Sequence, residues 1–133
     1  MRIWIHFVLL LCLPVCCGCG KQKSTDQLIQ DLNSSQEKDR IFAVRLLQLR
    51  EGEAAKVVPA LVKALKGHET DVRISAAIGL GYFGGEAKEA IPALQEAEKD
   101  RDRRVREAAG VALSRIDPEK FSVPTSPAKH RAK

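Results

Sequence analysis

A repeat of 33 residues constrains this chain more strongly than any other feature of its sequence. When residues 52–84 are aligned with residues 85–117, 12 of the 33 positions are identical. In the first of these segments the identical positions are Gly52, Glu53, Ala54, Pro59, Ala60, Leu61, Ala64, Lys66, Val72, Arg73, Ala76 and Leu80. A fixed period in the range of about 20–50 residues is typical of proteins that stack copies of one supersecondary unit. The sequence therefore predicts a repeat protein.

The clearest unit, residues 52–84, has the pattern of two helices with a short polar turn between them. Its first half carries apolar residues at the i, i+3, i+4, i+7 spacing of one helix face, namely Val58, Leu61, Val62 and Leu65. Pro59 is predicted in the first turn of this helix, where a missing amide costs nothing. Gly67 ends the helix, and Thr70 or Asp71 begins the second one. The second helix then places four apolar residues on one side, Val72, Ala76, Leu80 and Phe83.

A degenerate unit precedes this one over residues 24–51. Leu28, Ile29 and Leu32 occupy the positions of the apolar stripe one period earlier. Ser24 has the spacing of a capping box, with a glutamine three residues later. The second helix of this unit is expected from residue 36 to about residue 50, although Asp39 stands where the other units have valine.

The third unit, residues 85–117, reads as the end of the array. Gln95 and Glu98 replace two apolar residues of the stripe, and a stacked array needs a polar outer face on its last unit. Helix formation is expected to stop at Asp117, before a proline. Residues 118–133 are predicted to be a disordered basic tail, with the alternative that Phe121 and Val123 fold back over the open end.

These patterns predict an all-α fold, a short α-solenoid of three helix pairs. The predicted organisation is a signal peptide over residues 1–18, a tether over residues 19–23, and one repeat domain over residues 24–117, followed by the tail. A chain of 133 residues has room for one such domain.

The residues shared between the units also resemble a known family. The pattern V-P-A-L, followed by D-x-V-R-x-x-A-A-x-x-L, is similar to the HEAT-like repeats of the phycobilisome-lyase type. The middle unit carries it at residues 58–61 and 71–80, and the third at residues 91–94 and 105–113, with Arg104 in place of the expected aspartate. The resemblance implies an α-solenoid. Some members of that family attach bilin pigments, whereas most such modules are binding scaffolds, so the fold leaves the activity open.

The N-terminal segment has the features of a secretory signal. Arg2 precedes an apolar run over residues 3–15, which is shorter than the roughly 20 residues that span a bilayer. A basic start, an apolar core of about 7–15 residues and small residues after it are typical of a signal peptide.

The apolar run leads to Gly18 and Cys19, which resemble the last two positions of the bacterial lipoprotein signal. In that family a small residue precedes a cysteine that is diacylated and becomes the mature N-terminus, so Cys19 is the predicted lipidation site. Cys16 is the runner-up, because a leucine stands three residues before it but Val15 occupies the place of the small residue. The alternatives to a lipidation site are an ordinary cleaved signal, an uncleaved anchor, and a redox or metal motif made by these cysteines.

A lipid at this position would hold the protein at a membrane. Each buried methylene of an acyl chain contributes about 0.8 kcal/mol, and several chains together anchor stably. Gly20 is not acidic, and resemblance to the lipoproteins of enteric bacteria then favours the outer membrane. The predicted location is the bacterial cell envelope, with the repeats facing the periplasm.

The sequence offers no grouping of residues that predicts catalysis, a cofactor or a metal site. His6, His68 and His130 lie far apart, and none joins a ligand pair or a Ser-His-Asp or Cys-His arrangement. His68 is predicted to be a solvated turn residue. All four cysteines lie in the first 19 residues, so none cross-links the repeats. The prediction is therefore that the protein is not an enzyme.

The strongest charge signal is basic, over residues 99–106. Arg101, Arg103 and Arg104 are predicted to stay exposed, where they would meet anionic lipid headgroups or an acidic partner. Each such charge contributes about 1 kcal/mol near a membrane.

Three other arginines, Arg40, Arg73 and Arg106, recur at the period of the repeat. They are predicted to form a structural ladder that ties adjacent units together. In HEAT-like families such an arginine often pairs with an aspartate of a turn, and Asp71 and Asp102 are available here.

Together these features predict a non-catalytic, membrane-anchored scaffold that binds an unidentified protein on the concave face lined by the second helices, around residues 39–50, 72–83 and 105–116. The alternatives are a bilin-lyase-like protein or other enzyme accessory, and a cytoplasmic regulatory or nucleic-acid-binding scaffold if the N-terminus is not processed. The net charge of +5 does not establish nucleic-acid binding, and no aromatic platform accompanies the cations. The sequence does not predict an oligomeric state.

Overall fold

The computed structural model describes residues 22–121, and these residues form helices and turns. In chain order the elements are α1 (Thr25–Asp31), α2 (Glu37–Leu47), α3 (Ala54–Leu65), α4 (Thr70–Phe83), the 3-10 helix η1 (Gly84–Ala90), α5 (Ile91–Ala97) and α6 (Arg103–Ile116). The predicted signal peptide, with Cys16 and Cys19, lies outside the described residues, as do His6 and His130.

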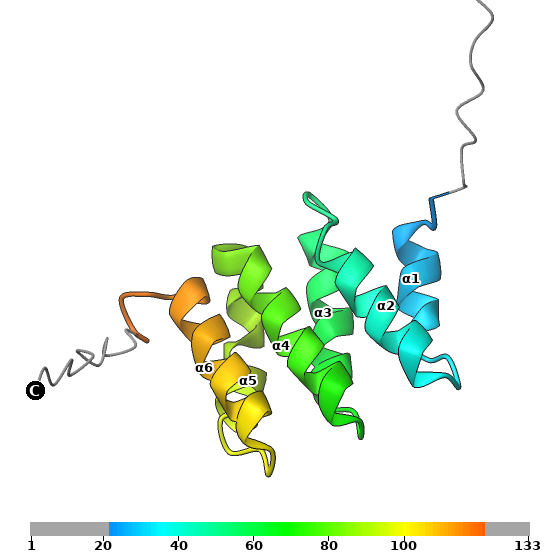
Figure 1. The fold of residues 1–133 in the computed structure, drawn as a ribbon. Coiled ribbons are helices and arrows are strands. Elements are labelled where there is room, and N and C mark those ends of the chain that lie inside the picture. Colours follow the sequence, from blue (N-terminus) through cyan, green and yellow to red (C-terminus); the bar gives the residue numbers. More distant parts are fainter. Residues whose placement is uncertain (1–21, 122–133) are drawn as a thin grey trace, which may run out of the picture.

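The helices form two layers. Figure 1 shows α2, α4 and α6 side by side in front, with α3 and α5 behind them. Contacts join α4 to α2 and to α6 within the first layer, and each of these helices packs on the first helix of its own unit. No strand occurs within residues 22–121. The predicted fold class, an all-α fold with the helix pairs of a short α-solenoid, is confirmed.

The core repeats with the same period as the sequence. Six leucines are fully buried: Leu28, Leu61 and Leu94 on the first helices, and Leu47, Leu80 and Leu113 on the second helices. Within each set of three the leucines follow one another at the period of the repeat. Burial of a leucine side chain contributes about 1.5–3 kcal/mol. The leucines therefore explain why successive units adopt the same packing.

Two glycines of α4 allow the helices to approach closely. A Cβ atom on Gly79 would lie 3.1 Å from Leu61 Cδ1, and one on Gly81 would lie 3.1 Å from the Cα of Ala112. The second contact is with the backbone of α6, which cannot move aside as a flexible side chain can. Glycine in a helix interior costs about 1 kcal/mol relative to alanine, and the close packing of α4 on α6 offsets that loss.

Pro59 lies inside α3 rather than in its first turn, so that prediction is wrong. The helix begins five residues earlier, at Ala54, because Ala54 and Val57 belong to the buried core and the intervening residues are compatible with a helix. The equivalent stretch of the third unit forms η1 instead, so α5 begins late and Pro92 does fall in its first turn. Two units with closely similar sequences thus start their first helices differently.

The two ends of the domain are closed differently. At the start, Ser24 and Gln27 form the predicted capping box, with hydrogen bonds of 3.2 and 3.0 Å. At the other end α6 stops at Ile116, and residues 118–121 continue as a turn that places Phe121, partly buried, against the core. Residues 118–121 of the predicted tail therefore form a turn, and Phe121 covers apolar surface at the end of the stack. Val123 lies outside the described residues.

Candidate interaction surface

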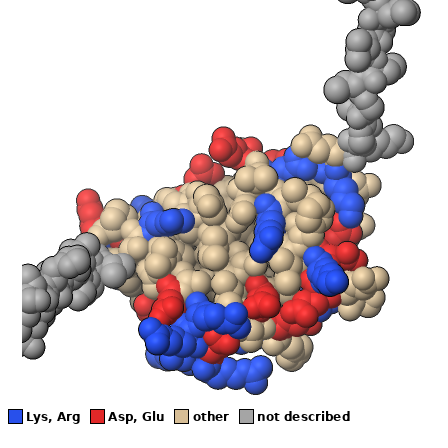
Figure 2. Space-filling view, in the orientation of Figure 1, with Lys and Arg blue, Asp and Glu red and all other residues tan. Residues whose placement is uncertain are grey.

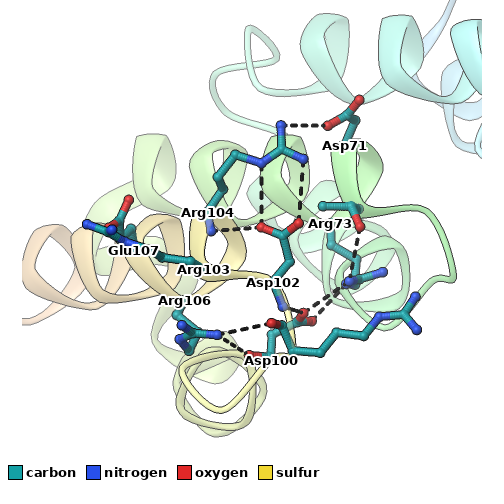
Figure 3. Close-up of polar contacts among 10 residues, drawn as sticks. Asp71, Arg73, Asp100, Asp102, Arg103, Arg104, Arg106 and Glu107 are labelled. Atoms are coloured by element: carbon teal, nitrogen blue, oxygen red, sulfur yellow. Dashed lines mark hydrogen bonds and ion pairs between the residues drawn. The ribbon is translucent and has the colours of Figure 1, made fainter.

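Arg73, near the start of α4, joins the second unit to the third. Its side chain is 7% exposed. Nε and Nη2 donate to the two carboxylate oxygens of Asp100, at 2.8 and 3.0 Å. Nη1 donates to the carbonyl oxygens of Gly67 and His68, at 3.2 and 2.7 Å. One guanidinium therefore closes the turn of its own unit and holds the turn of the next (Figure 3).

Asp100 is held in its ionised form by this arrangement. It lies in the turn between α5 and α6, and its Oδ1 also accepts from the backbone N–H of Asp102 at 2.8 Å. The hydrogen bonds from Arg73 lower the pKa of Asp100 below its ordinary value of 3.8, and the Asp102 amide lowers it further. Bidentate, charge-assisted pairs of this kind are among the stronger hydrogen bonds in proteins.

Arg40 on α2 and Arg106 on α6 repeat parts of this arrangement. Arg40 donates to the carbonyl oxygen of Ser34, in its own turn, and to the carboxylate of Glu69, in the next unit. Arg106 donates to two carbonyl oxygens of its own turn at 2.8 and 3.2 Å, and within residues 22–121 it forms no ion pair. The three arginines share the bond to their own turn, and the first two add an ion pair to the following unit. We call this set the arginine ladder.

The carboxylate that pairs with Arg73 is not one that the sequence suggested. Asp71 and Asp102 both lie 3.5 Å from Arg104 instead. Asp102 caps α6 by accepting from the Arg104 N–H at 2.8 Å, and this bond lowers the pKa of Asp102 below its ordinary value. Asp100 pairs with Arg73 because it lies two residues before the cap, inside the turn that the guanidinium reaches.

The basic turn before and within α6 stays at the surface. Arg101 is exposed, and the side chain of Arg103 is 81% exposed although it pairs with Glu107 at 2.6 Å. The side chain of Arg104 is 64% exposed. Exposed ion pairs of this kind contribute about 0–1 kcal/mol, so they leave these cations available to another molecule.

The outer side of the layer formed by α2, α4 and α6 carries exposed apolar side chains. Five large apolar side chains in the described part of the chain are exposed, and all lie on these helices or directly after one of them: Phe42, Leu49, Ile78, Tyr82 and Val111. Figure 2 shows this side of the molecule with a mostly uncharged middle that contains a few isolated cations, and with acidic side chains towards the edges. We call this surface the second-helix face.

A groove of about 480 Å³ lies on the second-helix face between α2 and α4. Its lining residues are Ile41, Arg45, Gln48, Asp71, Ile74, Ser75, Ile78 and Arg104. Sequence reasoning named the helices of this face but missed its apolar side chains. The available signal was that Leu49 and Tyr82, and likewise Ile78 and Val111, occupy equivalent positions outside the buried stripe.

A wider hollow of about 670 Å³ lies at the turns between the second and third units, where Arg73 and Asp100 line it. His68 also lines this hollow and is exposed, as predicted for a solvated turn residue. Among residues 22–121, no group of three or more histidine, cysteine, aspartate and glutamate side chains could hold a metal ion. The same residues contain no helix that is long and apolar enough to cross a membrane.

Stacked helix pairs with this repeating core define an α-solenoid. The family model for HEAT repeats matches residues 25–114, and the chain belongs to that family. Among solved structures it is similar to the complex of CpcE and CpcF of phycocyanin lyase from Nostoc sp. PCC7120, with 29% sequence identity and a TM-score of 0.63. That match covers 73% of this chain but only 38% of the other. No curated protein matched the chain. The predicted resemblance to HEAT-like repeats of the lyase type is thereby confirmed.

Proposed function

We propose that the protein is an exported lipoprotein whose HEAT repeats bind another protein on the second-helix face. The observation that carries this proposal is the row of exposed apolar side chains along three adjacent helices. Each of these side chains is 41–68% exposed. Contiguous exposed apolar surface of this kind marks interaction sites. The mechanism is recognition rather than turnover.

The repeat architecture also favours a binding role. Solenoids present an extended surface to their partners, and the second helices of successive units form it. The similar solved structure is itself a complex of two named proteins, CpcE and CpcF, which supports a protein as the partner. Arg104 lines the groove of this surface, and together with the neighbouring exposed Arg101 and Arg103 it would add contacts to an acidic group or to lipid headgroups.

A photo-crosslinking amino acid tests the binding surface in cells. We expect crosslinks to another protein when it replaces Tyr82 on the second-helix face, and none when it replaces Gln95. Gln95 is an accessible control, because it is exposed on α5 in the opposite layer. Crosslinks of equal yield from both positions, or from Gln95 alone, would show that the face does not bind a partner.

The anchor is proposed from the N-terminal sequence, in which Gly18 and Cys19 match the end of a lipoprotein signal. Metabolic labelling with a radioactive fatty acid tests it. We expect label on the wild-type chain and on Cys16→Ser, and loss of label on Cys19→Ser. Label that survives both substitutions would refute lipidation at these cysteines, and an intact mass equal to that of the full chain would show that the N-terminus is not processed. Membrane fractionation of the labelled protein then tests the proposed outer-membrane location.

A second candidate function is that of a bilin-lyase-like protein or an accessory subunit. The similarity to the phycocyanin lyase complex favours it. The test is incubation of the full chain with a bilin and an acceptor phycobiliprotein subunit. Pigment that remains on the acceptor after denaturation, beyond the amount attached without the chain, would establish lyase activity.

A further inference from the structure

The groove between α2 and α4 has an apolar floor made by both of its walls. Ile41 comes from α2, and Ile74 and Ile78 come from α4. Ile41 and Ile74 are partly buried against the core, whereas Ile78 is 41% exposed. An apolar side chain of another molecule would therefore contact Ile78 directly and meet the other two isoleucines beneath it.

Two cations of the second-helix face have no carboxylate partner among the described residues. Arg45 lines the groove and is exposed. Arg115 is exposed on α6, where its guanidinium lies 5.6 Å from the centre of the Tyr82 ring. These positions place one arginine on each side of the apolar residues of α4. A partner that covers this apolar surface would bring its own side chains against both arginines.

The one carboxylate that lines the groove is already paired. Asp71 lies 3.5 Å from Arg104, and Glu107 lies 2.6 Å from Arg103. Arg45 is therefore the unmatched charge of the groove lining, and it is positive. A partner with acidic side chains next to apolar ones would match it, whereas a basic partner would be repelled.

The backbone of the partner is constrained by the fold. Residues 22–121 contain no strand, so they offer no sheet edge to which a peptide could add by main-chain hydrogen bonds. Grooves between helices bind amphipathic helices instead, through apolar anchors at i, i+3, i+4 and i+7.

From these observations we propose that the groove between α2 and α4 binds an acidic amphipathic helix of a partner protein. Apolar residues of that helix contact Ile78 and Tyr82, and its carboxylates lie against Arg45 and Arg115. The inference rests on the proposed function, because it names the chemistry of the partner that the second-helix face would bind.

A matched pair of synthetic peptides tests the proposal. Both are amphipathic helices with leucine at the anchor positions; one carries glutamate at the borders of the apolar stripe, and the other carries lysine at the same positions. Fluorescence anisotropy with the full chain in neutral detergent measures the affinity. We expect the acidic peptide to bind at least about tenfold more tightly than the basic one, with the difference falling as salt is added.

Three variants of the full chain assign the binding to the groove. Arg45→Glu should weaken the acidic peptide by about tenfold and strengthen the basic one, because the charge at the groove wall is reversed. Ile78→Ser should weaken both peptides, because it removes part of the apolar floor. Lys63→Glu is the control for Arg45→Glu, since Lys63 is exposed on α3 in the opposite layer, and it should change either affinity less than about twofold. Circular dichroism checks that each variant is folded.

The proposal is overturned if the two peptides bind equally, or if Arg45→Glu and Ile78→Ser leave the acidic peptide unaffected. A competition experiment distinguishes a lipid ligand from a protein helix. Phosphatidylglycerol or phosphatidylcholine is added to the detergent together with the acidic peptide. If only phosphatidylglycerol displaces the peptide, the face binds an anionic lipid surface instead. Failure here is separable from failure of the proposed function. Crosslinks at Tyr82 in cells without preference for acidic peptides would keep the scaffold and reject only the acidic helix.

Discussion

The contact that we expect to matter most for stability is the ion pair between Arg73 and Asp100. The informative change is Arg73→Met, because methionine keeps an unbranched stem of similar length and removes the guanidinium. The variant loses both bonds to Asp100 and both bonds to the carbonyl oxygens of the Arg73 turn. The carboxylate of Asp100, whose side chain is only 15% exposed, then remains without its cation.

The magnitude follows from this burial. Removing one partner of a buried ion pair costs about 3–5 kcal/mol, because the other charge is left uncompensated. Asp100 keeps the Asp102 amide as a donor, which places the expected loss near the lower end, at about 3 kcal/mol. For a domain of this size each kcal/mol lowers the melting temperature by about 4–8 °C. We therefore expect Arg73→Met to melt at least about 12 °C below the wild type.

Arg106→Met is the matched control, since the repeat provides the same residue at the same position of the next unit. Arg106 is exposed, and its two bonds are to carbonyl oxygens of its own turn, which water can satisfy once the guanidinium is removed. The expected loss is about 0.5–1.5 kcal/mol. Thermal unfolding followed by circular dichroism measures both variants under one set of conditions.

Equal losses in Arg73→Met and Arg106→Met would refute the reasoning, because they would show that the ion pair between units contributes nothing beyond the turn. A double-mutant cycle gives an independent check. Asp100→Asn should destabilise the wild type by more than it destabilises Arg73→Met, with a coupling of about 1–3 kcal/mol. A coupling near zero would place the stabilisation elsewhere.

Two further predictions concern pH and packing. Because the pKa of Asp100 is lowered on folding, its contribution to stability is complete above its ordinary pKa of 3.8 and is lost as the pH falls below that value. The melting temperature of Asp100→Asn should therefore fall less steeply below about pH 4 than that of the wild type, and parallel curves would contradict this. Gly81→Ala should destabilise the domain by about 1–3 kcal/mol in chemical denaturation, because its Cβ meets the backbone of Ala112 at 3.1 Å. Gly85→Ala meets nothing within 4 Å and should be neutral or stabilising by up to about 1 kcal/mol; the opposite order would refute the close-packing explanation.

The fold was predictable because the period and the apolar stripe agree. A leucine that recurs at the period of the repeat can be buried at the same place in every unit, as Leu28, Leu61 and Leu94 are. Helix ends were less predictable. Pro59 and Pro92 occupy equivalent sequence positions, yet one lies inside a helix and the other in a first turn, because the preceding residues form an α-helix in one unit and a 3-10 helix in the other.

The partners of side chains were harder to predict than the helices. The ladder arginines were recognisable from their spacing, but the choice of Asp100 over Asp71 for Arg73 depends on where a turn places a carboxylate in three dimensions. The exposed residues of the second-helix face were also missed. An apolar residue such as Tyr82 has the same appearance in a sequence whether it lies in the core or on the surface, and only the position of the neighbouring helices decides between the two.

The ladder and the groove are linked by geometry, which leads to a last prediction. The ion pair between Arg40 and Glu69 joins α2 to the start of α4. These two helices form the walls of the groove. The pair between Arg73 and Asp100 joins the second unit to the third instead. Glu69→Gln should therefore weaken binding of the acidic peptide more than Asp100→Asn does. The effects on stability should have the reverse order, because the side chain of Glu69 is 36% exposed and that of Asp100 only 15%. Anisotropy and thermal unfolding on the same two variants measure both orders. If affinity and stability rank the variants alike, the peptide responds to general loosening of the fold, and the Arg40 pair does not set the spacing of the groove walls.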